Sequence, residues 1–367
     1  MSGGGPVGVA VVGAGNISTQ YLQNLTRFPD LRVLAIADLD VERAAAVAAE
    51  HGVPDSGAVA EVLALPEVEL VVNLTIPAAH AEVALAALAA GKHVYGEKPL
   101  TLDPVSARAV LAEAAATGLR VGNAPDTFLG AAIQTALRTV ASGAIGTPVA
   151  GAAWFQSPGP ERWHPSPEFL FARGAGPLFD MGPYYLTALV ALLGPVASVA
   201  AAGHKAHEER IVGSGPKAGT AFPVEVPTHV NALLEFAGGA GGAATFSFDS
   251  PQPRQAIEIT GTEGTLLVPD PNHFNGRLRL RRLGAEEPET VETTGTAVGR
   301  GIGVLDMARA LRSGTLHRAS GELALHVLEV MAAIAASADG AAFVPVPAWA
   351  EKLEALPEEW DPFAATL

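Results

Sequence analysis

Short apolar runs and alanine-rich segments of helical length alternate through the first third of the sequence. The runs lie at Val7–Val12, Leu31–Ala37, Leu70–Leu74, Lys92–Tyr95 and Leu119–Val121. The segments between them are expected to form helices near 16–27, 41–51, 78–90 and 104–117. Strands that helices cover on both faces read as unbroken apolar runs rather than alternating ones. The alternation therefore predicts an α/β domain built on a doubly wound parallel sheet.

A different pattern begins after about residue 124. One helix is expected near 127–142 and another near 180–193, but most of the other segments are strand-like and are separated by Gly, Pro and Asp. The strand-like runs lie at 149–156, 196–202, 226–236, 243–248, 255–260, 264–268 and 277–282. Residues 204–225 are expected to form a polar arm, and two more helices are expected near 302–313 and 320–338. The sequence therefore predicts two domains, 1–124 and 125–367, the second being α+β with a largely antiparallel sheet.

The charge balance narrows the possible partners. Lys and Arg number 23 against 38 Asp and Glu, which gives the 367-residue chain a net charge of −15. Phosphate backbones and anionic membrane surfaces require clustered cations, so neither nucleic acid nor a membrane surface is an expected partner. The chain has no cysteine, which excludes disulfides, thiolate metal sites and cysteine nucleophiles. Neither a membrane span nor a basic secretory leader is expected, and a cytoplasmic location is predicted.

A glycine-rich turn follows the first predicted strand and opens a helix, with the sequence Gly13-Ala14-Gly15-Asn16-Ile17-Ser18. In such a turn the first glycine permits the tight bend, and the second lets the backbone approach a pyrophosphate at the helix N-terminus. Ser18 replaces the usual third glycine, where a small side chain permits close helix–strand packing. Asp38 ends the second predicted strand, where a carboxylate accepts hydrogen bonds from an adenosine ribose and repels a 2′-phosphate. No arginine directly follows Asp38, so NAD is favoured over NADP, the alternative being an ordinary turn with a surface aspartate.

Two further clusters carry candidate catalytic groups. Glu97 and Lys98 follow a predicted strand, at the edge where open α/β sheets bind ligands, and a lysine there can donate to a substrate hydroxyl. Asp180 and Tyr184 are four residues apart, so they share one face of a predicted helix. Thr187 continues that face, which is expected to point away from the core. Considered singly, Lys98 is also typical of a solvated strand end, Asp180 of a helix N-cap and Tyr184 of a surface or core aromatic.

Together, the Gly13 turn, Glu97-Lys98-Pro99 and the Asp180–Tyr184 helix resemble the glucose–fructose oxidoreductase/inositol dehydrogenase (Gfo/Idh/MocA) family over nearly the whole chain. The resemblance implies an N-terminal Rossmann domain that binds NAD(P). It implies a C-terminal α+β domain whose open, mostly antiparallel sheet packs against a second subunit, in a homodimer or homotetramer. It also implies that Lys98 contacts the reacting hydroxyl, that the Lys98–Pro99 peptide is cis and that Asp180 binds substrate. Many members carry a histidine base where this chain has Tyr184, which argues against a plain inositol dehydrogenase.

The same resemblance extends to less distinctive positions. It places Thr75, Pro77 and His80 on the nicotinamide-ribose side of the cofactor, with Glu97 and Asn123 at strand ends near the nicotinamide. Side chains that could form a sugar-binding rim are Trp154, Arg162, Trp163 and His164, and His229 could point toward the substrate. For each of these, packing or surface exposure is an equally good explanation. No metal site is predicted, because the sequence places no third ligand beside His204 and His207.

These features predict an NAD-dependent oxidoreductase that transfers a hydride between nicotinamide and a secondary alcohol or ketone of a sugar, polyol or related cyclic alcohol. Tyr184 would exchange the hydroxyl proton, with Lys98 and Asp180 in the same network. A free tyrosine has a pKa of about 10, so a neutral phenol can protonate an alkoxide without the lowered pKa that a base would need, which favours reduction. Two alternatives are open at this point: an NAD-dependent glycosidase that oxidises its substrate transiently, and a non-catalytic NAD(H)-binding sensor or corepressor.

Overall fold

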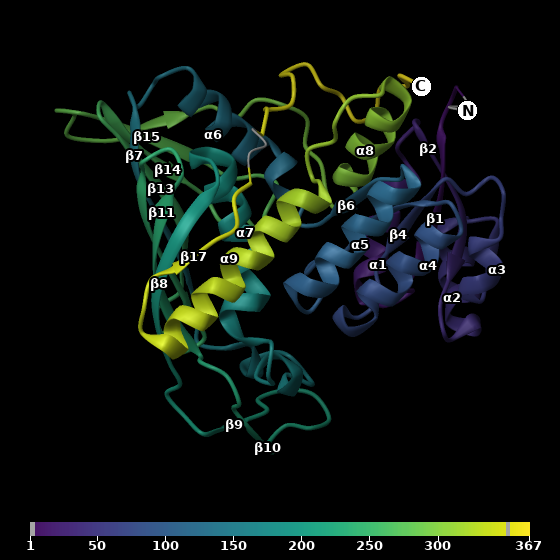
Figure 1. Cartoon of the computed structure of the whole chain (residues 1–367), viewed down its shortest axis with the longest axis horizontal. Coiled ribbons are helices and arrows are strands. Elements are labelled where there is room, and N and C mark those ends of the chain that lie inside the picture. Colours follow the sequence, from purple (N-terminus) through teal and green to yellow (C-terminus); the bar gives the residue numbers. More distant parts are fainter. Residues whose placement is uncertain (1–3, 350–352) are drawn as a thin grey trace. The chain divides into compact units, whose positions relative to one another are not determined.

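The computed structural model describes residues 4–349 and 353–367, which form two compact units (Figure 1). Unit 1 contains the residues up to Gly130 together with Gly295–Leu325 and Leu356–Leu367. Unit 2 contains Ala131–Thr294 and His326–Ala355. The predicted division at residue 124 is a single cut, whereas unit 1 is assembled from three segments of the chain.

Ion pairs fasten the late segments to unit 1. Arg309 Nε lies 2.7 Å from Oδ2 of the fully buried Asp30, and Arg312 Nη2 lies 2.7 Å from Glu69 Oε1. The Asp30 carboxylate also accepts hydrogen bonds from the backbone of Thr366 and Leu367. A pattern of apolar runs carries no information about such long-range pairs. That residues 295–325 and 356–367 return to unit 1 was therefore not predicted.

Unit 1 is built on a six-stranded parallel sheet in the order β3-β2-β1-β4-β5-β6, which confirms the predicted doubly wound architecture. Helices enclose the sheet in Figure 1. The strands are β1 (Val7–Val12), β2 (Leu31–Ala37), β3 (Asp55–Gly57), β4 (Leu70–Asn73), β5 (His93–Gly96) and β6 (Val121–Asn123). The helices are α1 (Asn16–Leu25), α2 (Val41–His51), α3 (Val59–Leu63), α4 (His80–Ala89), α5 (Pro104–Thr117) and α8 (Ile302–Ser313). Neither β3 nor α3 was predicted, since β3 is a polar tripeptide and α3 is one short turn.

The register of this sheet determines where the site lies. Val12 pairs with Ala37 and Asn73, Asn73 pairs with Gly96, and Gly96 pairs with Asn123. The carboxyl ends of five strands therefore meet at one edge. The segments that follow these strands carry Gly13, Asp38, Thr75, Lys98 and Asp126.

Unit 2 is built on a nine-stranded sheet in the order β16-β15-β14-β13-β7-β12-β11-β8-β17. Among the described strands of this sheet, only the β7–β12 pair is parallel, so the sheet is mostly antiparallel, as predicted. The strands are β7 (Pro148–Gln156), β8 (Val196–His204), β11 (His229–Phe236), β12 (Gly241–Ser247), β13 (Arg254–Gly261), β14 (Gly264–Val268), β15 (Leu278–Arg282), β16 (Glu289–Val291) and β17 (Val344–Pro345). The polar arm 204–225 contains a separate two-stranded sheet of β9 (Glu209–Ile211) and β10 (Ala221–Pro223).

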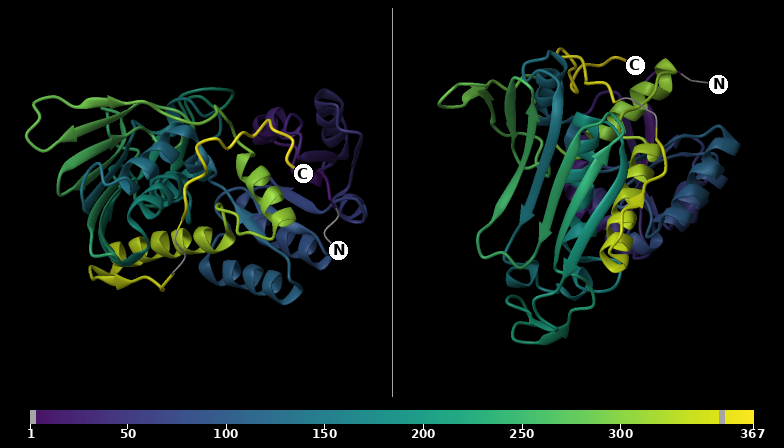
Figure 2. Two further views of the ribbon diagram at one scale, coloured as in Figure 1. Left: turned by 90° about the horizontal axis from the view of Figure 1, so that it is seen from above. Right: turned by 60° about the vertical axis from the view of Figure 1, so that its left-hand side comes forward.

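The two faces of this sheet differ. Helix α7 (Gly176–Leu193) covers one face, since a side chain at Gly151 of β7 would meet Leu189 and Leu193 of that helix. The alternating residues of β11, such as Leu234, are buried, whereas its neighbour Leu233 is 56% exposed on the other face. Figure 2 shows the strands side by side. We call the face opposite α7 the outer face.

Two further helices belong mainly to unit 2: α6 (Ala131–Ala141) and α9 (Gly321–Gly340). Helix α9 has the length and composition of a membrane-spanning helix, but 56% of its most apolar window is buried in the structure. His326 Nε2 of this helix accepts a hydrogen bond from Val196 N, and Ser337 Oγ accepts one from Ala201 N. These bonds to β8 are typical of a core helix.

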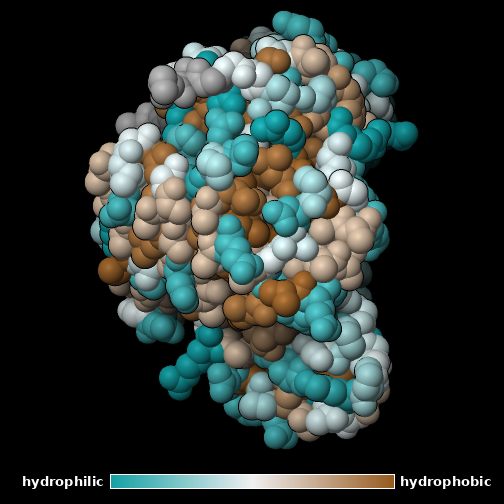
Figure 3. Space-filling view, turned by 90° about the vertical axis from the view of Figure 1, so that its right-hand side faces the viewer, coloured by the Kyte–Doolittle hydropathy of each residue, from teal (hydrophilic) through white to brown (hydrophobic). Residues whose placement is uncertain are grey.

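Apolar residues are not confined to the interior. Helix α2 exposes Ala45, Ala46 and Ala49, and in Figure 3 hydrophobic residues are interspersed with hydrophilic ones on the face shown. Scattered small apolar side chains are ordinary on protein surfaces. The 49% hydrophobic content therefore reflects alanine-rich helices as well as the core.

Candidate cofactor and catalytic site

The glycine turn after β1 has the features that its sequence predicts. Gly13 has a φ of +105°, and a side chain there would come within 2.6 Å of the Leu74 carbonyl oxygen. At Gly15 no described atom lies within 4 Å of the position that a Cβ would take, so the backbone is open to a ligand. Ser18 is buried, and its Oγ donates to the Gly15 carbonyl over 2.7 Å. The serine therefore fills the third-glycine position with a hydrogen bond of its own.

Asp38 follows β2 and is 8% exposed. Its carboxylate accepts hydrogen bonds from Ala14 N over 2.7 Å and from Asp40 N over 2.9 Å. Arg43 Nη2 of α2 lies 2.5 Å from Asp38 Oδ1. Although burial raises the pKa of Asp38, the hydrogen bonds from Arg43 and the backbone hold that pKa below its ordinary value. Arg43 was not among the predicted site residues, because its only signal in the sequence is a cation in the first turn of the helix that follows Asp38.

The segment after β4 is a closed hydrogen-bonded loop. Asn73 Oδ1 accepts from Thr75 Oγ1 over 2.7 Å, and Asn73 Nδ2 donates to the His80 carbonyl over 3.1 Å. Pro77 is exposed and opens a short 3-10 turn. His80 is buried, with Nδ1 2.6 Å from the Pro99 carbonyl and Nε2 3.1 Å from the Thr75 carbonyl. Both ring nitrogens therefore face backbone oxygens, and the expected place of His80 beside the cofactor stays a prediction.

The turn after β5 carries Lys98 and is held by buried polar groups. Glu97 is 8% exposed; its Oε1 accepts from the Tyr21 hydroxyl over 2.6 Å, and its Oε2 accepts from Lys98 N over 2.9 Å. Burial and the neighbouring Glu97 raise the pKa of Tyr21, so its phenol keeps the proton that it donates. Asn123 Nδ2 donates to the Gly96 and Glu97 carbonyls, each over 2.9 Å. Glu97 and Asn123 thus brace this turn, and the Lys98–Pro99 peptide is cis, as the resemblance implied.

Asp126 is a buried acid that the sequence analysis missed. Its Oδ2 accepts hydrogen bonds from Gly301 N over 2.8 Å and Gly303 N over 3.1 Å, at the start of α8. Burial is the main cause that raises the pKa of Asp126, to about 6. A lone aspartate in Ala124-Pro125-Asp126 after β6 reads as a turn residue, and only the late return of the chain gives it partners.

In unit 2, Asp180 and Tyr184 lie on α7. The alternative interpretation placed Asp180 at the N-cap of this helix. The helix begins at Gly176, so Asp180 lies inside it instead. Tyr184 is 6% exposed and Thr187 is 2% exposed, whereas Asp180 is partly exposed. The prediction that this polar face points away from the core was therefore wrong for Thr187, because α7 is buried on nearly all sides. The neighbouring Tyr185 donates to Asp270 Oδ1 over 2.9 Å and packs in the core.

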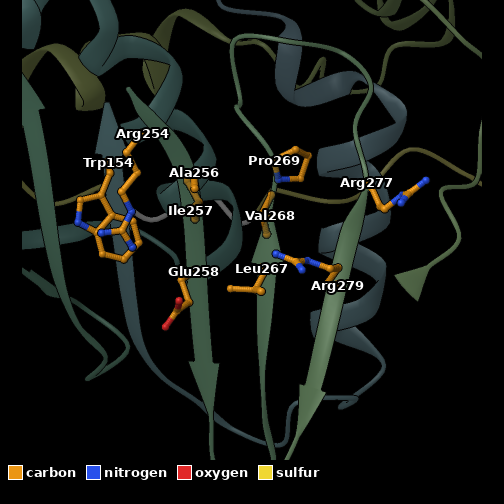
Figure 4. Close-up of a pocket in the computed structure, with 10 residues that line it drawn as sticks. All are labelled: Trp154, Arg254, Ala256, Ile257, Glu258, Leu267, Val268, Pro269, Arg277 and Arg279. Carbon is orange, nitrogen blue, oxygen red and sulfur yellow. The ribbon is translucent and has the colours of Figure 1, made fainter. Parts of the chain in front are cut away.

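Two of the residues predicted to bind substrate, Trp154 of the rim and His229, lie on the outer face, opposite α7. Figure 4 shows Trp154 beneath the guanidinium of Arg254, which is 3.4 Å from the ring centroid, in a hollow of about 310 Å³. His229 lies at the end of β11 with Nδ1 2.9 Å from Ser247 Oγ, and its ring centroid is 4.9 Å from that of His204. The structure therefore does not bring Trp154 or His229 together with Tyr184. Among the described residues no group of three His, Asp or Glu side chains has the arrangement of a metal site.

The remaining rim candidates come together in one loop that precedes α7. The His164 ring lies 5.6 Å from the Trp163 ring and 5.4 Å from the Phe169 ring, both edge-on. Trp163 is 68% exposed and Phe169 is 60% exposed. Arg162 is exposed too, and its Nε donates to the Pro158 carbonyl over 3.1 Å. The 3-10 turn that carries Phe169 contacts α7, so an aromatic surface adjoins the helix of Asp180 and Tyr184.

Comparison with known proteins identifies the family. Residues 7–124 match the sequence profile of an oxidoreductase family with an NAD-binding Rossmann fold, and residues 133–267 match the GFO/IDH/MocA C-terminal domain. The chain belongs to the Gfo/Idh/MocA oxidoreductase family. It is therefore an NAD(P)-dependent oxidoreductase.

Individual known proteins are similar to the chain over most of its length. A bovine (Bos taurus) trans-1,2-dihydrobenzene-1,2-diol dehydrogenase is 29% identical over 264 residues, which are 71% of this chain and 73% of that enzyme. An NAD-binding oxidoreductase from Klebsiella pneumoniae has a TM-score of 0.82 at 25% identity, covering 94% of this chain and 99% of its own. Levoglucosan dehydrogenase in complex with NADH and L-sorbose has a TM-score of 0.81 at 22% identity, with coverage of 94% and 99%.

The dinucleotide of this family fits the residues of unit 1. Helix α1 begins at Asn16 without a side-chain cap or an acidic first turn among the described residues, so its first N–H groups can bind a pyrophosphate. The side chains of Leu39 and Ile76 follow β2 and β4 and are 98% and 69% exposed, as apolar contacts of a nucleobase would be. The Gly13–Ile17 turn, Asp38 and Thr75 would hold the cofactor. When bound, the nicotinamide supplies the donor or acceptor of a hydride.

Proposed function

We propose that this protein is an NAD-dependent dehydrogenase or reductase for a secondary alcohol or ketone of a sugar, polyol or related cyclic alcohol. The observation that carries the proposal is the braced Lys98 turn, at the sheet edge that also carries the glycine turn and Asp38. Relatives named for a cyclic diol and for levoglucosan support the substrate class. The aromatic surface of Trp163 and Phe169 suits the C–H faces of such rings.

Tyr184, Lys98 and Asp180 would each have a different role in the proton transfer that accompanies hydride transfer. In reduction, the neutral phenol of Tyr184 protonates the forming alkoxide, and in oxidation its phenolate accepts the hydroxyl proton. The ammonium of Lys98 stabilises negative charge on either oxygen, and Asp180 orients the hydroxyl. A protonated phenol is the form that reduction requires, and a free phenol holds its proton at neutral pH. We therefore propose that reduction is the easier direction.

A substrate panel followed by nicotinamide absorbance in both directions tests the activity. The panel contains levoglucosan, L-sorbose, cyclic diols, inositols, glycosides and 3-keto sugars. Net NADH formation or consumption supports the proposal. Sugar release without net NADH would instead indicate a glycosidase, and NADH binding without any hydride exchange would indicate a sensor.

Single variants test the assigned residues. Lys98→Met and Tyr184→Phe should each lower kcat by about 10²- to 10⁴-fold, the range of general acid–base catalysis, while the Kd for NADH stays unchanged. Tyr185→Phe is the matched control, since it removes a neighbouring phenol that donates to Asp270. It should reduce stability and leave kcat near that of the wild type. Full turnover in Lys98→Met or in Tyr184→Phe would exclude the assigned roles.

We further propose that the cofactor is NAD. The Asp38 carboxylate would accept hydrogen bonds from the ribose hydroxyls and repel a 2′-phosphate, and Arg43 would hold it in place. Asp38→Asn should raise the Kd for NADH about tenfold and bring it closer to the Kd for NADPH. Arg43→Ala should change the Kd for NADH less, because Arg43 is half-exposed. Tighter binding of NADPH than of NADH by the wild type would contradict the assignment.

We also propose that the outer face joins two copies of the chain. It exposes Leu233 and a hollow of about 360 Å³ lined by Asn231, Thr245 and alanines of β8. Such an apolar sheet face is typical of a subunit interface. Light scattering should give the mass of a dimer or tetramer, and Leu233→Arg should reduce it to one chain. A wild-type mass of one chain would contradict this proposal.

A further inference from the structure

His80 opens α4 and is 2% exposed, and both of its ring nitrogens lie against backbone oxygens. Nδ1 is 2.6 Å from the Pro99 carbonyl oxygen, and Nε2 is 3.1 Å from the Thr75 carbonyl oxygen. The imidazole ring therefore stands between two loops that are far apart in the sequence. These are the loop after β4 and the turn after β5, which we call the cofactor loop (73–77) and the lysine turn (97–101).

The chemistry of the ring fixes what it can do in this place. A carbonyl oxygen only accepts hydrogen bonds, so each contact requires a ring N–H. An imidazolium bonds both oxygens at once, and either neutral tautomer bonds one of them. In a neutral tautomer the second nitrogen makes no hydrogen bond, but it still lies against a backbone oxygen in a ring that is 2% exposed. His80 therefore acts on the backbone of the two loops.

The backbone of His80 is fixed as well. Asn73 Nδ2 donates to the His80 carbonyl over 3.1 Å, and Asn73 Oδ1 accepts from Thr75 Oγ1 over 2.7 Å. Asn73 thus ties the start of α4 to the cofactor loop, and the ring of His80 reaches from there to Pro99. The backbone of His80 is therefore fixed by Asn73, and its ring lies between the Thr75 and Pro99 carbonyls.

The lysine turn is held on both sides of Lys98. On the N-terminal side, Lys98 N donates to Glu97 Oε2 over 2.9 Å, and Asn123 Nδ2 donates to the Glu97 carbonyl. On the C-terminal side, the Pro99 carbonyl receives the ring of His80. Glu97 N also donates to the Asn73 carbonyl over 2.9 Å, where β4 ends. On the C-terminal side of Lys98, it is the His80 contact that leads to the cofactor loop.

We propose that His80 is a positioning residue that links the cofactor loop to the lysine turn, so that the alignment of Lys98 depends on the loop that borders the dinucleotide. This inference rests on the proposed function, in which Lys98 acts on the substrate hydroxyl. It assigns His80 two separable effects: the Thr75 contact stabilises the cofactor loop, and the Pro99 contact aligns Lys98.

Two conservative variants separate these effects. The amide nitrogen of asparagine can take the place of Nδ1, so His80→Asn keeps a donor for Pro99 and loses the one for Thr75. The amide nitrogen of glutamine can take the place of Nε2, so His80→Gln keeps the Thr75 contact and loses the Pro99 contact. His80→Ala loses both. His317→Asn is the matched control in unit 1, because His317 is 6% exposed and its Nε2 bonds a single carbonyl, that of Val121.

Hydrogen exchange followed by mass spectrometry reads the two loops without any substrate. We expect His80→Asn to speed exchange in 73–77 by about tenfold, the effect of one ordinary hydrogen bond, and to weaken NADH binding. We expect His80→Gln to speed exchange in 97–101 by a similar factor and to lower kcat about tenfold while the Kd for NADH is kept. His80→Ala should show both changes, and His317→Asn neither.

The link is overturned if His80→Asn and His80→Gln change both loops alike, or if neither variant alters exchange or NADH affinity. Since both variants keep an amide in place of the imidazole, the comparison stands even if His80→Ala fails to fold. If Lys98→Met lost turnover while His80→Asn and His80→Gln behaved like the wild type, the proposed link through His80 would be refuted and the proposed function would stand. Full activity of Lys98→Met, with the two exchange effects present, would refute the proposed function and leave the contact between the loops.

Discussion

Arg210 of β9 offers a sharp test of how the polar arm is held. Its side chain is 8% exposed and forms ion pairs with Glu161, at 2.5 Å, and with Asp249. Its guanidinium also lies 5.2 Å from the centroid of the Phe171 ring. Glu161 is two residues from Trp163, so the pair fastens the arm to the loop that carries the aromatic surface. The perturbation that we choose is Arg210→Met, which keeps an unbranched apolar stem and removes the charge.

The magnitude follows from burial. The carboxylates of Glu161 and Asp249 are 9% and 12% exposed, and Arg210→Met would leave both without their cation. Removing one partner of a buried pair costs about 3–5 kcal/mol, because the other charge stays desolvated. For a unit of about 200 residues, such a loss lowers the melting temperature by about 10 °C.

Calorimetry and urea unfolding measure this loss. Arg282→Met is the control within unit 2, since Arg282 and Glu289 pair over 3.0 Å while more than half exposed. That pair should contribute less than about 1 kcal/mol. A triple variant that also carries Glu161→Gln and Asp249→Asn should recover most of the stability, because no buried charge is left unpaired. If Arg210→Met lost no more stability than Arg282→Met, the reasoning from burial would be refuted.

Two more predictions concern buried acids of unit 1. Burial raises the folded-state pKa of Asp126 to about 6, above the unfolded value of about 3.9. Between these two values the folded state keeps a proton that the unfolded state has lost. The free energy of unfolding should therefore fall by about 3 kcal/mol as the pH rises from 4 to above 6. Urea unfolding at several pH values should show this fall in the wild type relative to Asp126→Asn, and equal pH profiles would contradict it. Glu97→Gln places an amide N–H₂ against one of two donors, the Tyr21 hydroxyl or Lys98 N. It should lower the free energy of unfolding by about 1–3 kcal/mol. An unchanged free energy of unfolding would show that the carboxylate is not required.

The parallel sheet and its functional edge could be predicted from sequence because their signals are local. An apolar run that ends in Gly13, or one followed by Glu97-Lys98-Pro99, contains the strand, its end and the group placed there. The register of a parallel sheet then brings these ends together without further information. The mostly antiparallel sheet of unit 2 could be predicted in the same way from its strand-like runs, although β9, β10, β16 and β17 are too short or too polar to stand out.

Long-range pairing could not be predicted. Trp154 and His229 were chosen for their chemistry, but the alternation of β7 and β11 decides their face, and it turns both away from α7. Arg43, Asp126 and Arg210 have meaning only through partners that single-sequence patterns do not identify. The burial of Thr187 was missed for a related reason, since one polar stripe on a helix does not show what packs against it.

The Glu-Lys-Pro motif gains a physical explanation from these contacts. Its lysine is the group with the proposed chemistry, and its glutamate already accepts at both oxygens, from the Tyr21 hydroxyl and from Lys98 N. A carboxylate is the one side-chain group that accepts on both ends, so it can hold α1 and the lysine turn at the same time. Tyr21 lies on the helix that begins at the glycine turn. His80, at the start of α4, contacts both the Thr75 carbonyl of the cofactor loop and the Pro99 carbonyl of the lysine turn. The two segments expected to border the dinucleotide are therefore both bonded to the residues that flank Lys98. Errors in the placement of either segment should be transmitted to Lys98. If Lys98 acts as proposed, its place between a buried acid and a proline, rather than on an open strand end, keeps it aligned with both segments.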